Sequence, residues 1–136
     1  MHVLVHVHVL VLVYATRRAP WPIPPAMLDY EKLDVYRCSI EHLAMVFKWL
    51  SLLPRGHAAL GDQWRRAATS VPLNIAEATG KPSIGDRANK FAIARGEAME
   101  CGAILAALLE VVPPHELAVA KDLVERCVRM LTKLCL

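Results

Sequence analysis

Apolar residues recur along most of the chain with the period of amphipathic helices. From residue 29 onward they are spaced by three and four, which places them on one face of a helix with 3.6 residues per turn. The first such segment ends near Pro54 and Gly56, two residues that interrupt helices. Its predicted inward face consists of Leu33, Tyr36, Ile40, Leu43, Phe47 and Leu50.

Three more segments show the same pattern. The second, residues 60–79, has the inward face Leu60, Trp64, Ala67, Val71, Ile75 and Ala78, and the internal Pro72 predicts a kink without ending the helix. The third, which is the longest, has Ile84, Ala88, Phe91, Arg95, Ala98, Gly102, Leu105, Leu109 and Val112. The fourth has Leu117, Ala120, Val124, Cys127, Leu131 and Leu134.

The breaks between these segments are short. Gly80 and Pro82 end the second, Ser83 is a suitable N-cap for the third with Asp86 in its first turn, and Pro113 ends the third. Short connections between long helices favour antiparallel neighbours. Residues 27–136 are therefore predicted to form an all-α, antiparallel up-and-down four-helix bundle.

Residues 1–26 differ from the rest of the chain. Their apolar run precedes the two arginines, unlike a signal peptide, and is too short for a transmembrane helix. Its alternation suggests a strand, yet no sheet follows. Loose metal binding by His2, His6 and His8 is a further alternative. We favour translation from Met27, with residues 1–26 an unstructured leader or a misassigned start.

The composition suggests self-association. Hydrophobic residues make up 55% of the chain, above the roughly 45–50% of soluble domains. A small helical domain with more apolar surface than one core needs often buries the excess against another subunit. The four cysteines lie far apart without zinc-site spacing, which fits reduced thiols in a cytoplasmic protein. We expect no metal, no cofactor and no membrane association.

The net charge of +3 permits nucleic-acid binding but does not argue for it. Positive charge is concentrated in the middle of the chain, where residues 55–95 hold seven cations and three carboxylates. A weak interface with RNA, DNA or a ribonucleoprotein is therefore predicted at Arg55, Arg65, Arg87 and Lys90. Arg66 is less available if it faces the neighbouring helix.

A polar seam accompanies the apolar faces of the second and third helices. It consists of Gln63, Arg66, Ser70, Asn74, Glu77, Arg95 and Glu100. Arg95 stands where an aliphatic residue is usual, and a partly buried guanidinium needs a carboxylate. We therefore expect Arg95 to pair with Glu77. The alternative, an enzyme or ligand-binding pocket, has no histidine in the seam and no Cys or Ser beside a plausible base, so no catalytic residues are assigned.

Three runs of sequence resemble one family of proteins. They are LDVYRCSIEHL at 33–43, QWRRAATSVPLNIAEATGK at 63–81 and FAIARGEAMECGAIL at 91–105. They are similar to the proteins of 23S rRNA intervening sequences, a family that includes the accessory variability determinant of diversity-generating retroelements. The resemblance covers about residues 28–134. Ala78 and Glu97 depart from it, since the family usually has Gly and Ser there, and Ala78 could move the end of the second helix.

The resemblance implies a fold and an assembly. It implies a four-helix protomer in a barrel-like homopentamer, with the retroelement member engaging RNA and a reverse transcriptase through a basic surface. The mild charge of this chain does not favour that retroelement role. We expect a non-enzymatic, self-assembling structural or adaptor protein.

Overall fold

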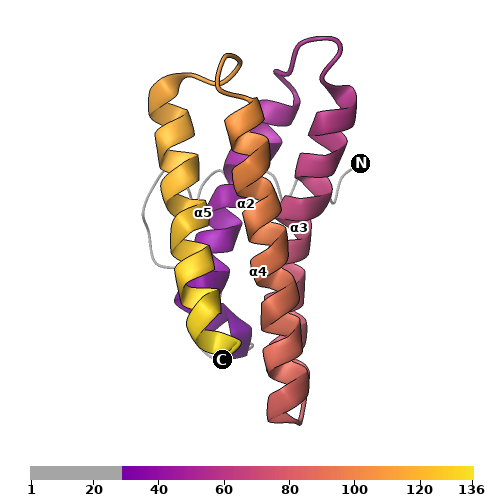
Figure 1. Ribbon diagram of the computed structural model, residues 1–136, viewed down its shortest axis with the longest axis vertical. Coiled ribbons are helices and arrows are strands. Elements are labelled where there is room, and N and C mark those ends of the chain that lie inside the picture. The colour runs from indigo at the N-terminus through magenta and orange to yellow at the C-terminus, as the bar shows by residue number, and fades with distance from the viewer. Residues whose placement is uncertain (1–28) are drawn as a thin grey trace.

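The computed structural model describes residues 29–136, so the predictions for residues 1–26 lie outside the described residues. A short 3-10 helix, η1 (Asp29–Lys32), leads into four α-helices. They are α2 (Asp34–Leu50), α3 (Ala58–Gly80), α4 (Ile84–Ala107) and α5 (Pro114–Leu134), shown in Figure 1. No β-strand occurs in residues 29–136, which confirms the all-α prediction.

Each of the four α-helices packs against two of the others. α3 contacts α2 and α4, and α5 contacts α4 and α2. Within residues 29–136, no contact joins α2 to α4 or α3 to α5, so these two pairs lie on diagonals. The α2–α3 and α4–α5 connections lie at one end of the molecule and the α3–α4 connection at the other (Figure 1).

The helix boundaries follow the local sequence. Ser83 caps α4 by accepting a hydrogen bond from the backbone N–H of Asp86 at 3.1 Å, which confirms the predicted N-cap. α3 continues through Pro72 and past Ala78 to Gly80. Pro114 begins α5, where its missing N–H costs no hydrogen bond. α4 ends at Ala107, before Val112, the last residue of the inward face predicted for this helix.

The interior consists of two large clusters of buried apolar side chains. One includes Val46, Trp64 and Leu108, and the other includes Ile75 and Leu131. All five side chains are almost completely removed from water. Burial of one large apolar side chain contributes roughly 1.5–3 kcal/mol, so these clusters are a main source of stability.

The predicted inward faces of α3 and α5 are largely correct, but that of α2 is rotated. Leu33, Tyr36, Phe47 and Leu50 were expected inside α2 and are only half-buried. Ile40 and Leu43 are buried as predicted, and the rest of the fully buried face of α2 consists of Val35, Cys38, Ser39, His42, Ala44, Val46 and Trp49. The difference arises because apolar residues surround most of α2, so spacing alone does not fix its orientation.

Two residues predicted on the inward face of α4 are exposed. Ile84 is 86% exposed and Leu109 is 61% exposed. Ile84 is the first residue of the helix, and Leu109 follows its end at Ala107. Helical periodicity therefore does not govern where Leu109 points, and Ile84 lies at the exposed end of α4.

Candidate nucleic-acid interface

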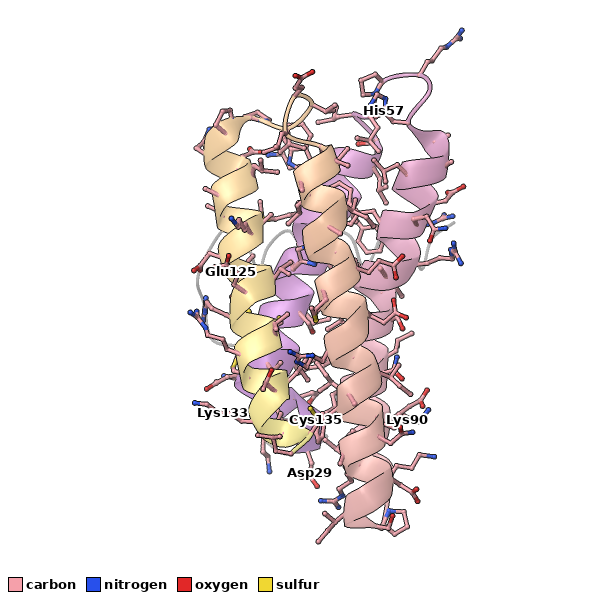
Figure 2. The ribbon with its side chains drawn as sticks, in the orientation of Figure 1. Asp29, His57, Lys90, Glu125, Lys133 and Cys135 are labelled. Carbon is pink, nitrogen blue, oxygen red and sulfur yellow. The ribbon has the colours of Figure 1, made fainter. Side chains whose placement is uncertain are left out.

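The four cations predicted to bind nucleic acid fall into two separate groups. Arg55 and Arg65 line a shallow groove of about 370 Å³ beside the α2–α3 connection. Arg87 and Lys90 lie in the first two turns of α4. Figure 2 shows His57, from the same connection as Arg55, and Lys90 near opposite ends of the molecule. The structure therefore does not bring the four cations together.

Three of these cations already have partners. Arg65 pairs with Asp62 at 3.1 Å, and Lys90 pairs with Glu77 at 2.9 Å, which lowers the pKa of the Glu77 carboxyl. The Nε of Arg87 donates a hydrogen bond to the carbonyl oxygen of Lys81 at 2.7 Å. A phosphate would compete with these partners, which weakens the case for this surface.

The expected pair between Arg95 and Glu77 is wrong. Arg95 Nε donates instead to the hydroxyl of Thr132 on α5 at 2.7 Å, and that hydroxyl donates to the Val128 carbonyl at 2.7 Å. Lys90, and not Arg95, pairs with Glu77 because the side chains of residues 90 and 95 point about 140° apart around a helix. Lys90 therefore faces α3, while Arg95 faces α5.

The rest of the polar seam does not converge on a cavity. Gln63, Arg66 and Glu100 are exposed. The side-chain amide of Asn74 donates to the carbonyl and hydroxyl oxygens of Ser70 at 2.8 and 2.9 Å, so these two residues satisfy each other. Such local contacts are typical of a structural role on the surface of the bundle.

Beside this seam, Glu97 on α4 has a carboxyl group whose pKa is raised. Partial burial raises the pKa of Glu97, and neighbouring Glu100 raises it further. The charge of Arg66 opposes this shift. Glu97, which departs from the family pattern, thus weakens the positive field of Arg66 where a phosphate would approach.

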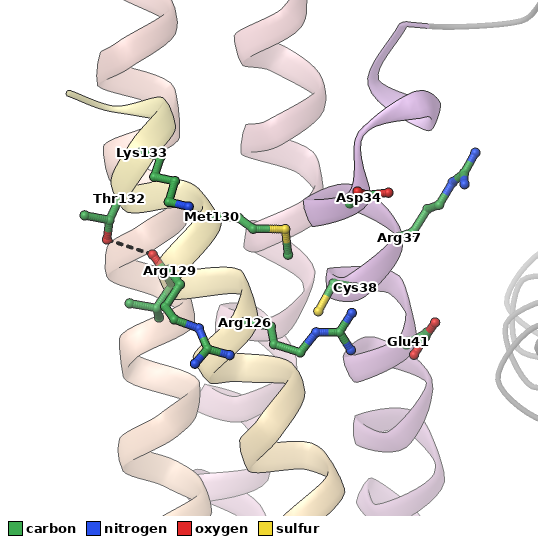
Figure 3. Close-up of a pocket in the computed structure, with 10 residues that line it drawn as sticks. Asp34, Arg37, Cys38, Glu41, Arg126, Arg129, Met130, Thr132 and Lys133 are labelled. Carbon is green, nitrogen blue, oxygen red and sulfur yellow. Dashed lines mark hydrogen bonds between the residues drawn. The ribbon is translucent and has the colours of Figure 1, made fainter.

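A larger groove lies between α2 and α5, and the sequence reasoning missed it. Its volume is about 690 Å³. It is lined by Asp34, Arg37, Cys38, Glu41, Arg126, Val128, Arg129, Met130, Thr132 and Lys133 (Figure 3). Four of these residues are cations and two are carboxylates. The signal in the sequence was the spacing of Arg126, Arg129 and Lys133, which puts all three on one side of α5.

A buried thiol lies at the bottom of this groove. Cys38 is 3% exposed, and its thiol donates a hydrogen bond to the Leu123 carbonyl at 3.2 Å. A hydrogen bond with Cys127 lowers the pKa of the Cys38 thiol, burial opposes that shift, and the charge of Arg126 lowers the pKa further. All four cysteines of the chain, Cys38, Cys101, Cys127 and Cys135, are free thiols.

Comparison with known proteins places the chain in a family. Residues 31–133 match the model of the 23S rRNA-intervening sequence protein family. The chain belongs to this family. No curated protein matches the chain.

The fold of this 23S rRNA-intervening sequence protein is similar to that of a solved structure. A crystal structure of a protein of unknown function, from the S23 ribosomal protein family of Bacteroides thetaiotaomicron, matches with a TM-score of 0.68. The two sequences are 23% identical over 74% of this chain and 97% of that chain. At this identity the likeness supports the fold alone.

Within residues 29–136, no group of three or more His, Cys, Asp or Glu side chains is arranged to hold a metal ion. None of the helices described above combines the length and apolar character needed to cross a membrane.

Proposed function

We propose that this protein is a non-enzymatic, self-assembling structural or adaptor component that binds nucleic acid or a ribonucleoprotein weakly. The protomer is an up-and-down four-helix bundle, and its copies form a ring-like homo-oligomer in the cytoplasm. Five copies are the number that the family resemblance implies. The net charge of +3 gives no support for engagement of a reverse transcriptase.

An uncharged face of α4 supports self-assembly. We call it the α4 outer face, and it consists of Ala92, Gly96, Met99, Ala103 and Ala107. All five residues are exposed in the protomer, although a solvent-facing helix surface usually carries charged residues. Their spacing of three and four gives a continuous stripe along the helix, on which another helix could pack closely.

Gly96 is the observation that carries this proposal. Glycine inside a helix costs about 1 kcal/mol relative to alanine, so its presence there needs a reason. Nothing lies within 4 Å of the position where a Cβ at Gly96 would stand, so the protomer itself gives no such reason. Close approach of a second copy would explain both the glycine and the small residues around it.

The competing role, an enzyme or ligand-binding bundle built on the polar seam, receives less support. Glu77 is paired with Lys90, Arg95 is bonded to Thr132, and Asn74 is bonded to Ser70. Groups that satisfy one another or face the solvent form no pocket of converging donors and acceptors. These contacts favour a structural use of the seam.

A charge placed on the α4 outer face is expected to break the assembly. Ala103→Glu would bury an unpaired carboxylate between two copies, which costs several kcal/mol, so association should weaken by at least about tenfold. Sedimentation or native mass measurement would detect the loss of the assembled species. The matched control is Ala59→Glu, because Ala59 is also exposed but lies in the first turn of α3.

The two variants distinguish an interface from a general effect of charge. Far-UV circular dichroism should show the same helix content in both, since each side chain is exposed in the protomer. If Ala103→Glu assembles as well as Ala59→Glu, the α4 outer face is not the interface between copies.

A further inference from the structure

We propose that the groove between α2 and α5 binds the phosphate backbone of RNA or DNA, without regard to base sequence. The proposal rests on the proposed function and moves its nucleic-acid interface away from α3 and α4. It follows from the charges that line the groove, from the partners those charges have, and from the position of the groove in the bundle.

The cations of the groove form a continuous track. Arg126, Arg129 and Lys133 are spaced by three and four residues on α5, so they extend over about 10 Å of the helix. Arg37 adds a fourth cation from α2 on the opposite wall. Guanidinium groups bind phosphate oxygens with two parallel hydrogen bonds, and three of the four cations are arginines.

These cations are less committed to partners than those on α3 and α4. Within residues 29–136, Arg129 and Lys133 take part in no ion pair, and Arg126 meets Asp122 only at 3.9 Å. The Nε of Arg37 donates to the Glu31 carbonyl at 3.0 Å, which holds the side chain in place and leaves other N–H groups of its fork for a ligand. A phosphate would therefore displace few existing contacts.

The two carboxylates of the groove both belong to α2. Figure 3 shows Asp34 and Glu41 on α2, and Arg129 and Lys133 on α5 across the groove. The two carboxylates should repel the phosphate groups, so that a phosphate chain lies closer to α5 than to α2. No aromatic side chain lines the groove, so bases have no ring to stack on there, and binding would depend on the phosphate backbone.

The position of the groove is compatible with assembly. α2 and α4 occupy a diagonal of the bundle, and the groove includes residues of α2 and α5 only. In a ring, the α4 outer face of one copy packs against a different surface of the next copy, and the groove stays open when that surface is not the α2/α5 side. An assembly would then carry one basic track on each protomer, and a nucleic acid long enough to reach two tracks would bind more tightly than to one.

Two double variants with the same change of charge test the location of the site. Arg129→Gln with Lys133→Gln removes two cations from the groove. Arg65→Gln with Lys90→Gln removes two from the surface predicted by sequence. Binding of a fluorescent 30-nucleotide RNA of mixed sequence is followed by anisotropy between 50 and 200 mM KCl, with native mass and circular dichroism measured for each protein.

The groove variant should bind the RNA about tenfold more weakly at 100 mM salt. The slope of its log affinity against log salt concentration should be shallower by about 1.4, because each lost phosphate contact of a single strand removes about 0.7. It should assemble like the parent protein. The α3/α4 variant should bind nearly as the parent does. A DNA of unrelated sequence should give the same ranking.

Several results would overturn the proposal. An equal or larger loss in the α3/α4 variant would place the interface there, and an unchanged groove variant would exclude the groove. Equal competition by polyglutamate of the same charge would show an acidic-protein site and not a phosphate site. If the parent protein retains no RNA at 50 mM salt, nucleic-acid binding fails altogether, whereas self-assembly is judged separately by the native mass.

Discussion

Trp64→Ala is expected to lower the free energy of unfolding by about 3–5 kcal/mol, because it removes the largest fully buried side chain and leaves a cavity. Trp64 is 1% exposed and packs in the cluster that contains Val46 and Leu108. Its indole N–H has no hydrogen-bond partner within the described residues, so the loss should come from packing. Urea unfolding followed by far-UV circular dichroism measures the change.

The control for this variant is Trp64→Phe, which keeps an aromatic ring in the cluster and should lose clearly less stability. Both proteins must be compared at one protomer concentration, since assembly contributes to the measured stability. A loss below about 1 kcal/mol for Trp64→Ala would be incompatible with a tightly packed core at this position.

Stability should also fall by about 2 kcal/mol between pH 7 and pH 5, because of His42. His42 is 3% exposed, and its Nε2 lacks a hydrogen-bond partner among residues 29–136. Burial lowers the pKa of His42 from 6.5 to about 4. In the unfolded chain, His42 therefore binds a proton near pH 6.5, whereas in the folded protein it binds one only near pH 4. The stabilisation is complete above pH 6.5 and is lost as the pH falls through this interval.

His42→Leu should remove most of this dependence, whereas His115→Gln, at an exposed position, should leave it unchanged. The lysine partners of Glu77 and Glu116 lower the pKa values of these two carboxyls. The stability that the two pairs contribute is therefore lost below the ordinary glutamate pKa of 4.5, outside the range from pH 7 to pH 5. A parent protein whose unfolding free energy is constant from pH 7 to pH 5 would show that His42 is hydrated or able to bind a proton in the folded state.

The sequence predicted the helices better than it predicted their orientation. Gly80, Pro82 and Ser83 act on the backbone locally, so the end of α3 and the start of α4 could be predicted from the chain alone, whereas α2 ends at Leu50, before Pro54, and α4 ends at Ala107, before Pro113. The inward face of α2 could not be predicted, because apolar residues lie on several of its sides. Leu109 was assigned to the seam of α4 because nothing in its spacing signalled that the helix ends at Ala107.

The candidate site was harder to predict for a related reason. Arg37 and Arg126 lie far apart in the chain and share a groove only because α2 packs against α5. The predicted cations Arg65 and Lys90 were chosen from the local excess of charge, which does not reveal that Asp62 and Glu77 neutralise them. Knowing which helices are neighbours was therefore necessary to find the groove.

In the function that we propose, the α4 outer face serves assembly and the α2/α5 groove serves nucleic-acid binding, on different sides of the protomer. The first is uncharged and contains small residues, which suits close packing of copies. The second carries four cations, of which Arg129 and Lys133 take part in no ion pair within residues 29–136, and this suits a phosphate chain. The arrangement fits a scaffold that multiplies a weak interaction by repeating it around an assembly.

The most direct test of self-assembly is the native mass of the protein at micromolar concentration. The protomer has a mass of 15.1 kDa. The account predicts a single species of several protomers, five if the assembly is a pentamer. On sufficient dilution this species should dissociate at the exposed face of α4. A species of 15.1 kDa at every concentration would contradict it.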